Sequence, residues 1–195
     1  AAVAKAAIET GVAKNVITDF EEYKLSLIKR IGKESTIMRN LTQTAKSNPK
    51  RVVFAEGDRF EILRAAQIVK EEKIAIPIIL GKKNKIQQMI KDYMLDLEDV
   101  EIVDTNAEED SDRYNQFVDF IYSKRQRKGI SKSDAKKLLR DRNYFGSCMV
   151  EFGYADAMIS GMTKNYSQAI RPALELIGAE QGQKVASMYM MLTEK

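Results

Sequence analysis

The chain has 195 residues, 44% of them apolar, and its 32 basic and 28 acidic side chains leave a net charge of +4. This length allows one domain or a little more with a real core, and so small a basic surplus gives no reason to expect a nucleic-acid partner. No segment is long and apolar enough to cross a bilayer and no secretory signal is present, so we expect no membrane partner.

Two residue types limit the chemistry. The chain has no histidine, which excludes a Ser-His-Asp triad and most catalytic zinc sites, and we expect no metal ligands. The single cysteine, Cys148, cannot form an internal disulfide and lies in an apolar helical run, where we expect a buried small hydrophobe rather than a nucleophile. A reducing, cytoplasmic location fits this cysteine usage.

The first part of the chain is predicted to be helical. Thr18 and Glu21 have the spacing of a capping box at the start of one helix, and Pro49 follows the end of another. The apolar spacing predicts three helices, at residues 1–13, 18–31 and 35–46.

From residue 51 onward, short apolar runs alternate with amphipathic segments. We expect strands at 51–55, 74–80, 100–103, 157–159 and 185–192. Helices are expected between them, at 82–94, 113–128, 144–153 and 167–177, with two more that begin at Asp58 and Ser131. This alternation predicts an α/β fold with a mostly parallel sheet covered on both faces by helices.

Three local patterns make this prediction more specific. Asp58 with Glu61 and Ser131 with Asp134 have capping-box spacing, and Pro77 indicates an edge position or an irregularity in its strand. Helical spacing predicts two buried stripes, one of Ile62, Ala65, Ala66 and Val69 and one of Tyr114, Phe117, Val118 and Ile121.

Two strand ends carry residues that suit a ligand. In parallel sheets ligands bind beyond the carboxyl ends of the strands, where Glu56 with Gly57 and Ser160 with Gly161 are expected. A small-residue turn that leads into a helix presents backbone N–H groups to an anion. We therefore interpret Ser160, Gly161 and nearby Thr163 as candidate phosphate contacts. The alternatives are an ordinary strand–helix loop and, for Glu56, a solvated turn residue.

Basic residues offer further candidates. Arg171 precedes Pro172 in an apolar helix, and a guanidinium group can hold phosphate with two parallel hydrogen bonds. A structural ion pair with a nearby carboxylate is the alternative. The run at 124–128 ends a helix, where cations complement the dipole, and on chemistry alone we favour that interpretation over a ligand site.

Taken together, these motifs resemble a known family. The segments concerned are Ala155–Gly161, Ile170–Ile177, Tyr144–Gly146, Val53–Gly57 and Ser123–Gly129. They are similar to segments of the phosphate acetyl/butyryltransferases (phosphotransacetylases). Residues 3–13 and 19–23 resemble the end of a bacterial malic enzyme and the linker after it, as in hybrid NADP-dependent malic enzymes. A departure is Gln126–Arg127, where many relatives have Lys-His.

The resemblance implies a fold, a domain plan and a site. It implies a three-layer α/β/α fold like that of isocitrate and isopropylmalate dehydrogenases, preceded by a helical linker. Residues 1–17 would end a malic-enzyme NAD(P)-binding domain, 18–50 would be a helical linker and domain entry, 51–183 a phosphotransacetylase-like first lobe, and 184–195 the start of a truncated second lobe. Arg125 and Arg171 would be catalytic. The substrate-binding site would be lined by Ser160, Gly161, Thr163, Glu56 and Gly57.

The resemblance also implies partners and an activity. Acetyl-CoA, acetyl phosphate or phosphate would bind, whereas NADP and a divalent metal would belong to a malic-enzyme domain outside this chain. The chain alone is expected to lack transferase activity and to form a homo-oligomer. Three functions stay open: an acetyl-CoA-binding regulator of a malic enzyme, which we favour, a working phosphate acetyltransferase, and an inert oligomerisation module.

Overall fold

The computed structural model describes residues 2–13, 17, 19–23, 36–107 and 111–191. They fall into two compact units, residues 1–42 with 189–195, and residues 43–188. In the first unit, α1 (Ala2–Glu9) confirms the first expected helix, and Gly11 behind it has a φ of +74°. Most of the helix expected at 18–31 lies outside the described residues. The third expected helix is α3 (Thr36–Ser47), which ends just before Pro49.

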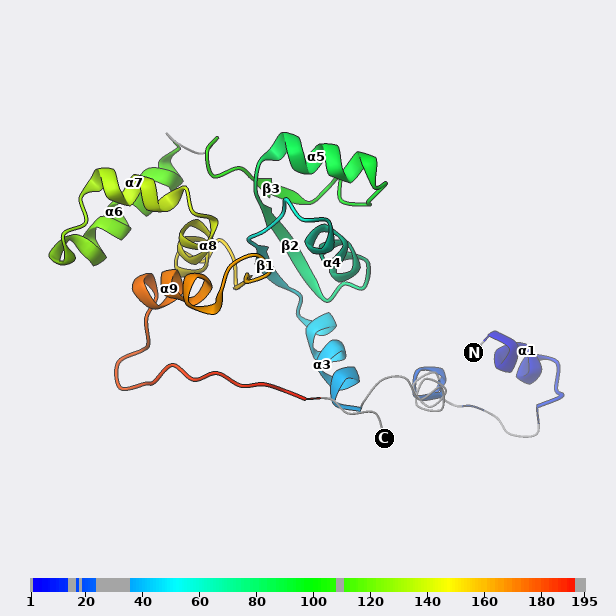
Figure 1. Cartoon of the computed structure of the whole chain (residues 1–195). Helices are drawn as coiled ribbons and strands as arrows, with labels where there is room; N and C mark the ends of the chain where they lie inside the picture. Colours follow the sequence, from blue (N-terminus) through cyan, green and yellow to red (C-terminus); the bar gives the residue numbers. More distant parts are fainter. Residues whose placement is uncertain (1, 14–16, 18, 24–35, 108–110, 192–195) are drawn as a thin grey trace. The chain divides into compact units, whose positions relative to one another are not determined.

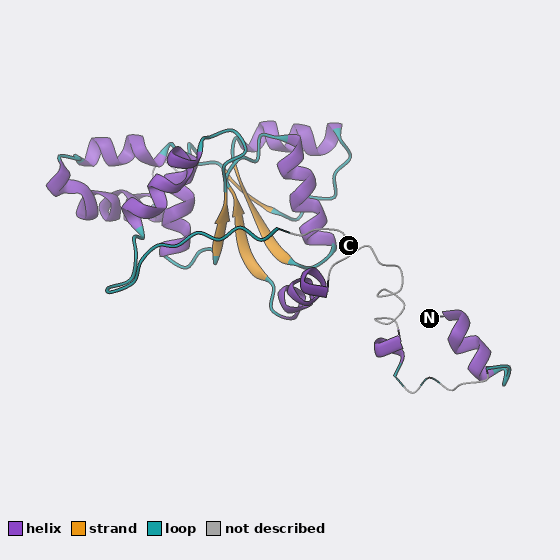
Figure 2. Cartoon of the chain, turned by 60° about the horizontal axis from the view of Figure 1, so that its bottom comes forward, coloured by secondary structure: helices purple, strands orange, loops and turns teal. Residues whose placement is uncertain are grey.

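The second unit is built on a parallel sheet of four strands, the orange arrows in Figure 2. The strands are β1 (Lys50–Phe54), β2 (Ala75–Leu80), β3 (Glu101–Val103) and β4 (Ala157–Ile159), in the order β3-β2-β1-β4. Phe54, Ile79 and Ile159 are aligned across the sheet. The carboxyl ends of all four strands therefore meet at one edge, as the sequence predicts.

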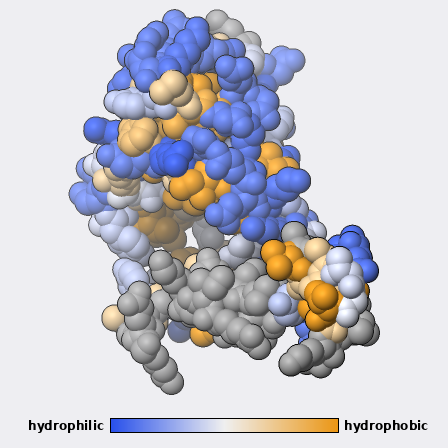
Figure 3. Space-filling model, turned by 90° about the vertical axis from the view of Figure 1, so that its right-hand side faces the viewer, coloured by the Kyte–Doolittle hydropathy of each residue, from blue (hydrophilic) through white to orange (hydrophobic). Residues whose placement is uncertain are grey.

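Helices cover both faces of the sheet (Figure 1). One face carries α4 (Phe60–Glu71) and α5 (Lys83–Asp92). The other carries α6 (Asp112–Arg125), the short 3-10 helix η1 (Gln126–Lys128), α7 (Lys132–Leu139), α8 (Arg142–Glu151) and α9 (Tyr166–Leu176). On the side that Figure 3 presents, hydrophilic side chains predominate and apolar ones show between them.

Alternating strand residues supply two cores. Val53, Ile78 and Leu80 pack with α6, α7 and α8, whereas Phe54 and Ile79 pack with α4 and α5. A strand directs successive side chains to opposite faces, so continuous apolar strands are what a sheet buried on both sides requires. The expected stripe on α6, the cap of α7 and the burial of Cys148 are confirmed.

The expected start of α4 is wrong. Its N-cap residue is Arg59, which has no side-chain cap hydrogen bond. Asp58 instead accepts a 2.6 Å hydrogen bond from Arg142 Nη1, and Lys85 Nζ lies 3.7 Å from its other carboxylate oxygen. The carboxylate of Asp58 therefore interacts with Arg142 and Lys85, which belong to other helices, and not with the backbone N–H groups at the start of α4. The expected stripe is confirmed in part: Ala66 is buried and Ile62 and Val69 pack against the core, while Leu63 and Gln67 are buried beside them.

Two strand expectations also need correction. The strand of Pro77 is central rather than an edge, because β2 pairs with both β1 and β3, but the β3 ladder begins only at Ile78. Pro77 has no N–H to donate, but it lies before the first residue of β2 that pairs with β3, so the pairing with β3 does not need that donor. The strand expected at 185–192 does not form between 185 and 191, where Val185 and Met188 are exposed and no described strand pairs with the segment. An apolar run becomes a strand only beside a partner.

Candidate functional site

Gly57 brings the chain tightly over the carboxyl end of β2. Its N–H donates to the carbonyl of Leu80 at 3.1 Å. A Cβ atom at this position would lie 2.1 Å from Ile79 Cγ2 and 2.9 Å from the Leu80 carbonyl oxygen. No side chain fits, so glycine is required here by close approach rather than by an unusual φ. This turn fixes the position of the preceding residue, Glu56.

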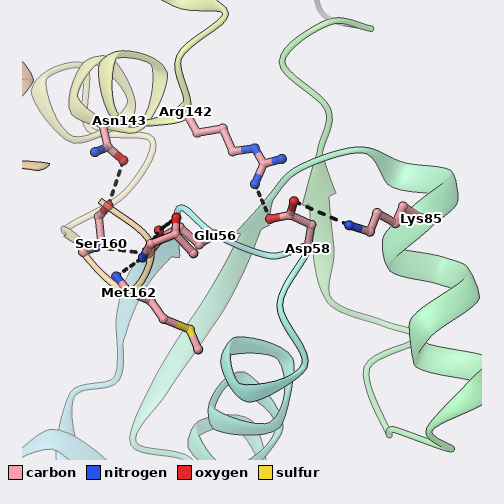
Figure 4. Close-up of polar contacts among 9 residues, drawn as sticks. Glu56, Asp58, Lys85, Arg142, Asn143, Ser160 and Met162 are labelled. Atoms are coloured by element: carbon pink, nitrogen blue, oxygen red, sulfur yellow. Dashed lines mark hydrogen bonds and ion pairs between the residues drawn. The ribbon is translucent and has the colours of Figure 1, made fainter. Parts of the chain in front are cut away.

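The Glu56 carboxylate is bonded to the loop after β4, where the sequence analysis expects the candidate phosphate contacts Gly161 and Thr163 (Figure 4). Its Oε2 accepts from the N–H groups of Gly161 at 3.1 Å and Met162 at 2.7 Å. Its Oε1 accepts from the Thr163 N–H at 2.7 Å and from the Thr163 hydroxyl. Burial favours a higher pKa for Glu56, which is 6% exposed, but these donors outweigh it and the pKa is lowered. The loop donors are thus already bonded to an anion of the chain itself.

Ser160 faces a different partner. Its hydroxyl donates to Asn143 Oδ1 at 2.8 Å, while Asn143 Nδ2 and the Ser147 hydroxyl are buried without a hydrogen-bond partner. Ser147 and Ser160 line a hollow of about 300 Å³ whose other walls are mainly apolar side chains of α8, β4 and α9, among them Ile170.

Arg125 and Arg171, 46 positions apart in the sequence, meet on one carboxylate. Arg125 Nη2 donates to Glu175 Oε1 at 3.0 Å and Arg171 Nε donates to the same oxygen at 2.8 Å. The Tyr144 hydroxyl donates to Glu175 Oε2 at 2.6 Å. The side chains of Arg125 and Glu175 are 16% and 14% exposed, and that of Arg171 is 69% exposed.

This cluster perturbs the titration of its members. Burial, followed by the hydrogen bond and charge of Glu175, raises the pKa of Tyr144 to about 12. Burial alone favours a raised pKa for Glu175, but the hydrogen bonds from Tyr144 and Arg171 and the two arginine charges outweigh it, so the pKa is lowered. Glu175 is therefore a carboxylate held between two guanidinium groups near neutral pH.

The two arginines open onto a shallow hollow of about 520 Å³, which we call the arginine hollow. Its charged lining comprises Arg125, Lys128, Arg171 and Glu175, and its other walls are Ser167, Ile170 and Leu174. Two of the three cations, Arg125 and Arg171, contact Glu175, and Lys128 lines the same hollow. The hollow therefore has positive charge in excess, which suits an anion.

The structure divides the expected site residues into two groups. Glu56, Gly57, Ser160, Gly161 and Thr163 gather at the carboxyl edge of the sheet, and Arg125 and Arg171 gather on α6 and α9. Ile170 lines both the Ser160 hollow and the arginine hollow, so the two groups adjoin across α9.

Sequence reasoning missed three members, Tyr144, Asn143 and Glu175, and it assigned Lys128, in the run at 124–128, to the end of a helix rather than to a ligand site. Only Glu175 had a local signal, its position four residues after Arg171 on the same helix. Among the described residues no cluster of His, Cys, Asp or Glu could hold a metal ion, and no helix has the length and apolarity that crossing a bilayer requires.

The comparisons with known proteins agree with this architecture. A family model described as phosphate acetyl/butaryl transferase matches residues 36–195. A probable NADP-dependent malic enzyme of Rickettsia prowazekii is 35% identical over 195 residues, which are 99% of this chain and 25% of that protein. A phosphate acetyltransferase of Nitratidesulfovibrio vulgaris is 36% identical over 156 residues, which are 80% of this chain and 22% of that protein.

A solved structure supports the fold. The EutD phosphotransacetylase from Staphylococcus aureus superimposes with a TM-score of 0.67 and 27% identity, over 76% of this chain and 45% of that one. The chain therefore spans about a quarter of the length of these curated relatives and less than half of this solved structure.

Proposed function

Because the chain belongs to the phosphate acetyl/butaryl transferase family, we propose that it binds the phosphate of acetyl phosphate, or acetyl-CoA, and so regulates a malic enzyme of which it is part. The observation that carries this proposal is the arginine hollow, which is lined by three cations, Arg125, Lys128 and Arg171, and by the single carboxylate of Glu175, which the two arginines contact. A phosphate group needs several cationic donors in one place.

Each cation has a distinct part in this proposal. Arg125 is held by Glu175 through its Nη2, so its guanidinium group would be preorganised beside the ligand. Arg171 is more exposed. Glu175 accepts from its Nε, which leaves the two Nη groups to face a ligand. Glu175 reduces the charge of the hollow without cancelling it, which favours a ligand with more than one negative charge over a monovalent anion.

The malic-enzyme part of the proposal is supported by how much of this chain each relative aligns with. The malic-enzyme relative aligns with 99% of the chain, whereas the phosphate acetyltransferase aligns with 80% and the family model begins at residue 36. Residues 1–35 thus have counterparts in the malic enzyme that the family model lacks. We propose that NADP and a divalent metal serve the malic-enzyme reaction outside this chain, in the cytoplasm and in a homo-oligomer.

The alternative is a working phosphate acetyltransferase, in which phosphate attacks the acetyl carbon of acetyl-CoA and the CoA thiolate leaves. The arginines would stabilise the negative charge that develops on the carbonyl and phosphate oxygens. The presence of both arginines in one hollow favours this reading as well. Because the chain spans under half of the solved phosphotransacetylase, we expect residues beyond it to be needed for turnover.

A ligand titration tests the binding proposal. We expect acetyl phosphate to shift the amide resonances around Arg125, Arg171 and Glu175, and Arg171→Ala to weaken binding about tenfold, the loss of one charge-assisted contact. Arg64→Ala is the matched control, because Arg64 is an exposed helix arginine bonded to Gln67 one turn away. If Arg171→Ala and Arg64→Ala bind alike, the assignment of the hollow is wrong.

An activity assay separates regulator from transferase. The intact polypeptide that contains this chain is assayed for malate oxidation with and without acetyl-CoA, and for acetyl phosphate formation from acetyl-CoA and phosphate. A regulator predicts that acetyl-CoA changes the malic-enzyme rate and that Arg171→Ala abolishes this change. Acetyl phosphate formation that Arg171→Ala abolishes would support the transferase instead.

A further inference from the structure

The arginine hollow contains an acid that works against an anionic ligand. Glu175 is the one acidic side chain among the described residues that line this hollow. A carboxylate repels a phosphate group, and its burial costs free energy unless donors satisfy it. The side chain of Glu175 is nonetheless only 14% exposed. Its position therefore needs a reason other than attraction of the ligand.

Glu175 connects three helices. Arg125 belongs to α6, Tyr144 to α8, and Arg171 to α9, the helix of Glu175 itself. The two arginines share one carboxylate oxygen, Oε1, with donor nitrogen atoms at 3.0 Å and 2.8 Å. The Tyr144 hydroxyl donates to the other oxygen, Oε2, at 2.6 Å. Both oxygens are thus bonded, and one carboxylate fixes the direction of all three donors.

The carboxylate keeps two like charges close together. A donor nitrogen atom of Arg125 and one of Arg171 both lie within 3.0 Å of the same oxygen, and guanidinium groups that close repel each other unless a negative charge lies between them. The exposed side chain of Arg171 would also move among many rotamers if nothing held it. A ligand that had to order both arginines would bind more weakly. Glu175 orders them before the ligand binds.

Tyr144 holds the carboxylate in turn. It is a buried member of the core on the α6–α9 side of the sheet, so its hydroxyl is a fixed donor. Because burial, followed by the hydrogen bond to Glu175, raises the pKa of Tyr144 to about 12, the hydroxyl keeps its proton at neutral pH. Its bond to Oε2 fixes the plane of the carboxylate and so the direction in which Oε1 faces the arginines. Tyr144 therefore acts on the arginines through Glu175.

We propose that Glu175 and Tyr144 are positioning residues, which hold Arg125 and Arg171 together so that both can bind one anionic ligand. This inference rests on the proposed function, because it concerns the same hollow. It reverses the effect that charge alone would give to Glu175. Loss of the carboxylate removes a repulsion, but it also releases the two arginines. The second effect is the larger, because water and salt screen the repulsion in a shallow hollow.

Titration of the full chain with acetyl phosphate, followed by amide resonances, tests the direction of this effect. We expect Glu175→Ala to weaken binding about tenfold, because the ligand must then order two arginine side chains. Glu175→Gln keeps an amide oxygen for the arginines and removes the charge, so it should bind at least as tightly as the wild type. Glu61→Ala is the control, because it removes an exposed carboxylate from α4 on the other face of the sheet, and it should leave the affinity unchanged.

Tyr144→Phe tests the second positioning residue. It removes only the hydroxyl, and we expect acetyl phosphate to bind about threefold more weakly. Tyr93→Phe is the control, because Tyr93 is exposed at the end of α5. The side-chain Nε–Hε resonance of Arg171 supplies a readout that a loss of stability alone would not move. In Tyr144→Phe and Glu175→Ala this resonance should shift and exchange faster with water at temperatures where the variants are fully folded.

Three outcomes would overturn the proposal. They are binding by Glu175→Ala as tight as that of the wild type or tighter, equally weak binding by Glu175→Gln and Glu175→Ala, and an unchanged Arg171 Nε–Hε resonance in Tyr144→Phe. Failure of the proposed function is different, because Arg171→Ala itself would then leave the affinity for acetyl phosphate unchanged. If Arg171→Ala weakens binding and Glu175→Ala strengthens it, the hollow binds the anion and only the positioning role is wrong.

Discussion

Replacement of Glu56 by glutamine tests how the carboxyl edge of the sheet is held together. The carboxylate accepts from three backbone N–H groups and from the Thr163 hydroxyl. Glutamine keeps the size of the side chain but turns one acceptor oxygen into an NH₂ donor, so one pair of loop donors loses its acceptor. The substitution also removes the charge that strengthens the remaining bonds.

The expected loss follows from these contacts. A hydrogen bond to a charged group contributes about 1.5–3 kcal/mol, and an exposed donor that water can reach loses less than a buried one. Gly161, Met162 and Thr163 are exposed, whereas Glu56 is 6% exposed. We therefore expect Glu56→Gln to lower the free energy of unfolding by about 2–3 kcal/mol, measured by urea denaturation at pH 7.

The pH dependence gives an independent check. Because folding lowers the pKa of Glu56 below its ordinary 4.5, the unfolded state binds the proton more readily. Its contribution is therefore present above about pH 4.5 and is lost as pH falls through the folded-state pKa. Between pH 6 and 3 the wild type should lose more stability than Glu56→Gln does.

A matched control isolates the effect. Glu98 is exposed and has no hydrogen bond or ion pair among the described residues, so Glu98→Gln should unfold like the wild type. If Glu56→Gln and Glu98→Gln have the same urea midpoint at pH 7 and the same pH profile, the carboxylate does not hold the loop and the reasoning fails.

Three further predictions concern single contacts. Gly57→Ala places a Cβ 2.1 Å from Ile79 Cγ2 and should destabilise the protein by about 3 kcal/mol, seen as a lower thermal midpoint; an unchanged midpoint would contradict the close approach. Tyr144→Phe removes the hydroxyl that donates to Glu175 and should remove the tyrosine that titrates near pH 12 from the ultraviolet absorbance titration, at a cost of about 1–2 kcal/mol; persistence of that titration would refute the assignment. Burial raises the pKa of the Cys148 thiol, so it should react with a thiol reagent only after urea unfolds the chain, and rapid labelling at neutral pH would show the burial to be wrong.

Patterns of short range were predicted well. The period of apolar residues located α6 and its buried face, and the spacing of Ser131 and Asp134 gave the cap of α7. Continuous apolar strands indicated a parallel sheet buried on both faces, which the parallel strand pairing and the two cores confirm. The segment at 185–191 shows the limit of this method, because an apolar run does not say whether a neighbouring strand is available.

Contacts between residues far apart in the sequence were harder to predict. Asp58 has a capping-box sequence, but its partner is Arg142, 84 positions away, and nothing local to Asp58 reveals that competition. Glu56 was placed at the ligand edge from the sequence, but its bonds to residues 161–163 are more than 100 positions distant. Whether these residues contact a ligand stays a prediction.

The sequence by itself determined most of the secondary elements, the two-sided burial of the sheet and the chemical types at the strand ends, because these depend on side-chain periods of a few residues. Only the tertiary structure decided which carboxylate meets which cation. In the folded chain Arg125 and Arg171 both donate to Glu175, and the backbone of the loop after β4 donates to Glu56. Such pairings depend on the strand order and on the helix that crosses back, which bring distant residues within hydrogen-bond reach.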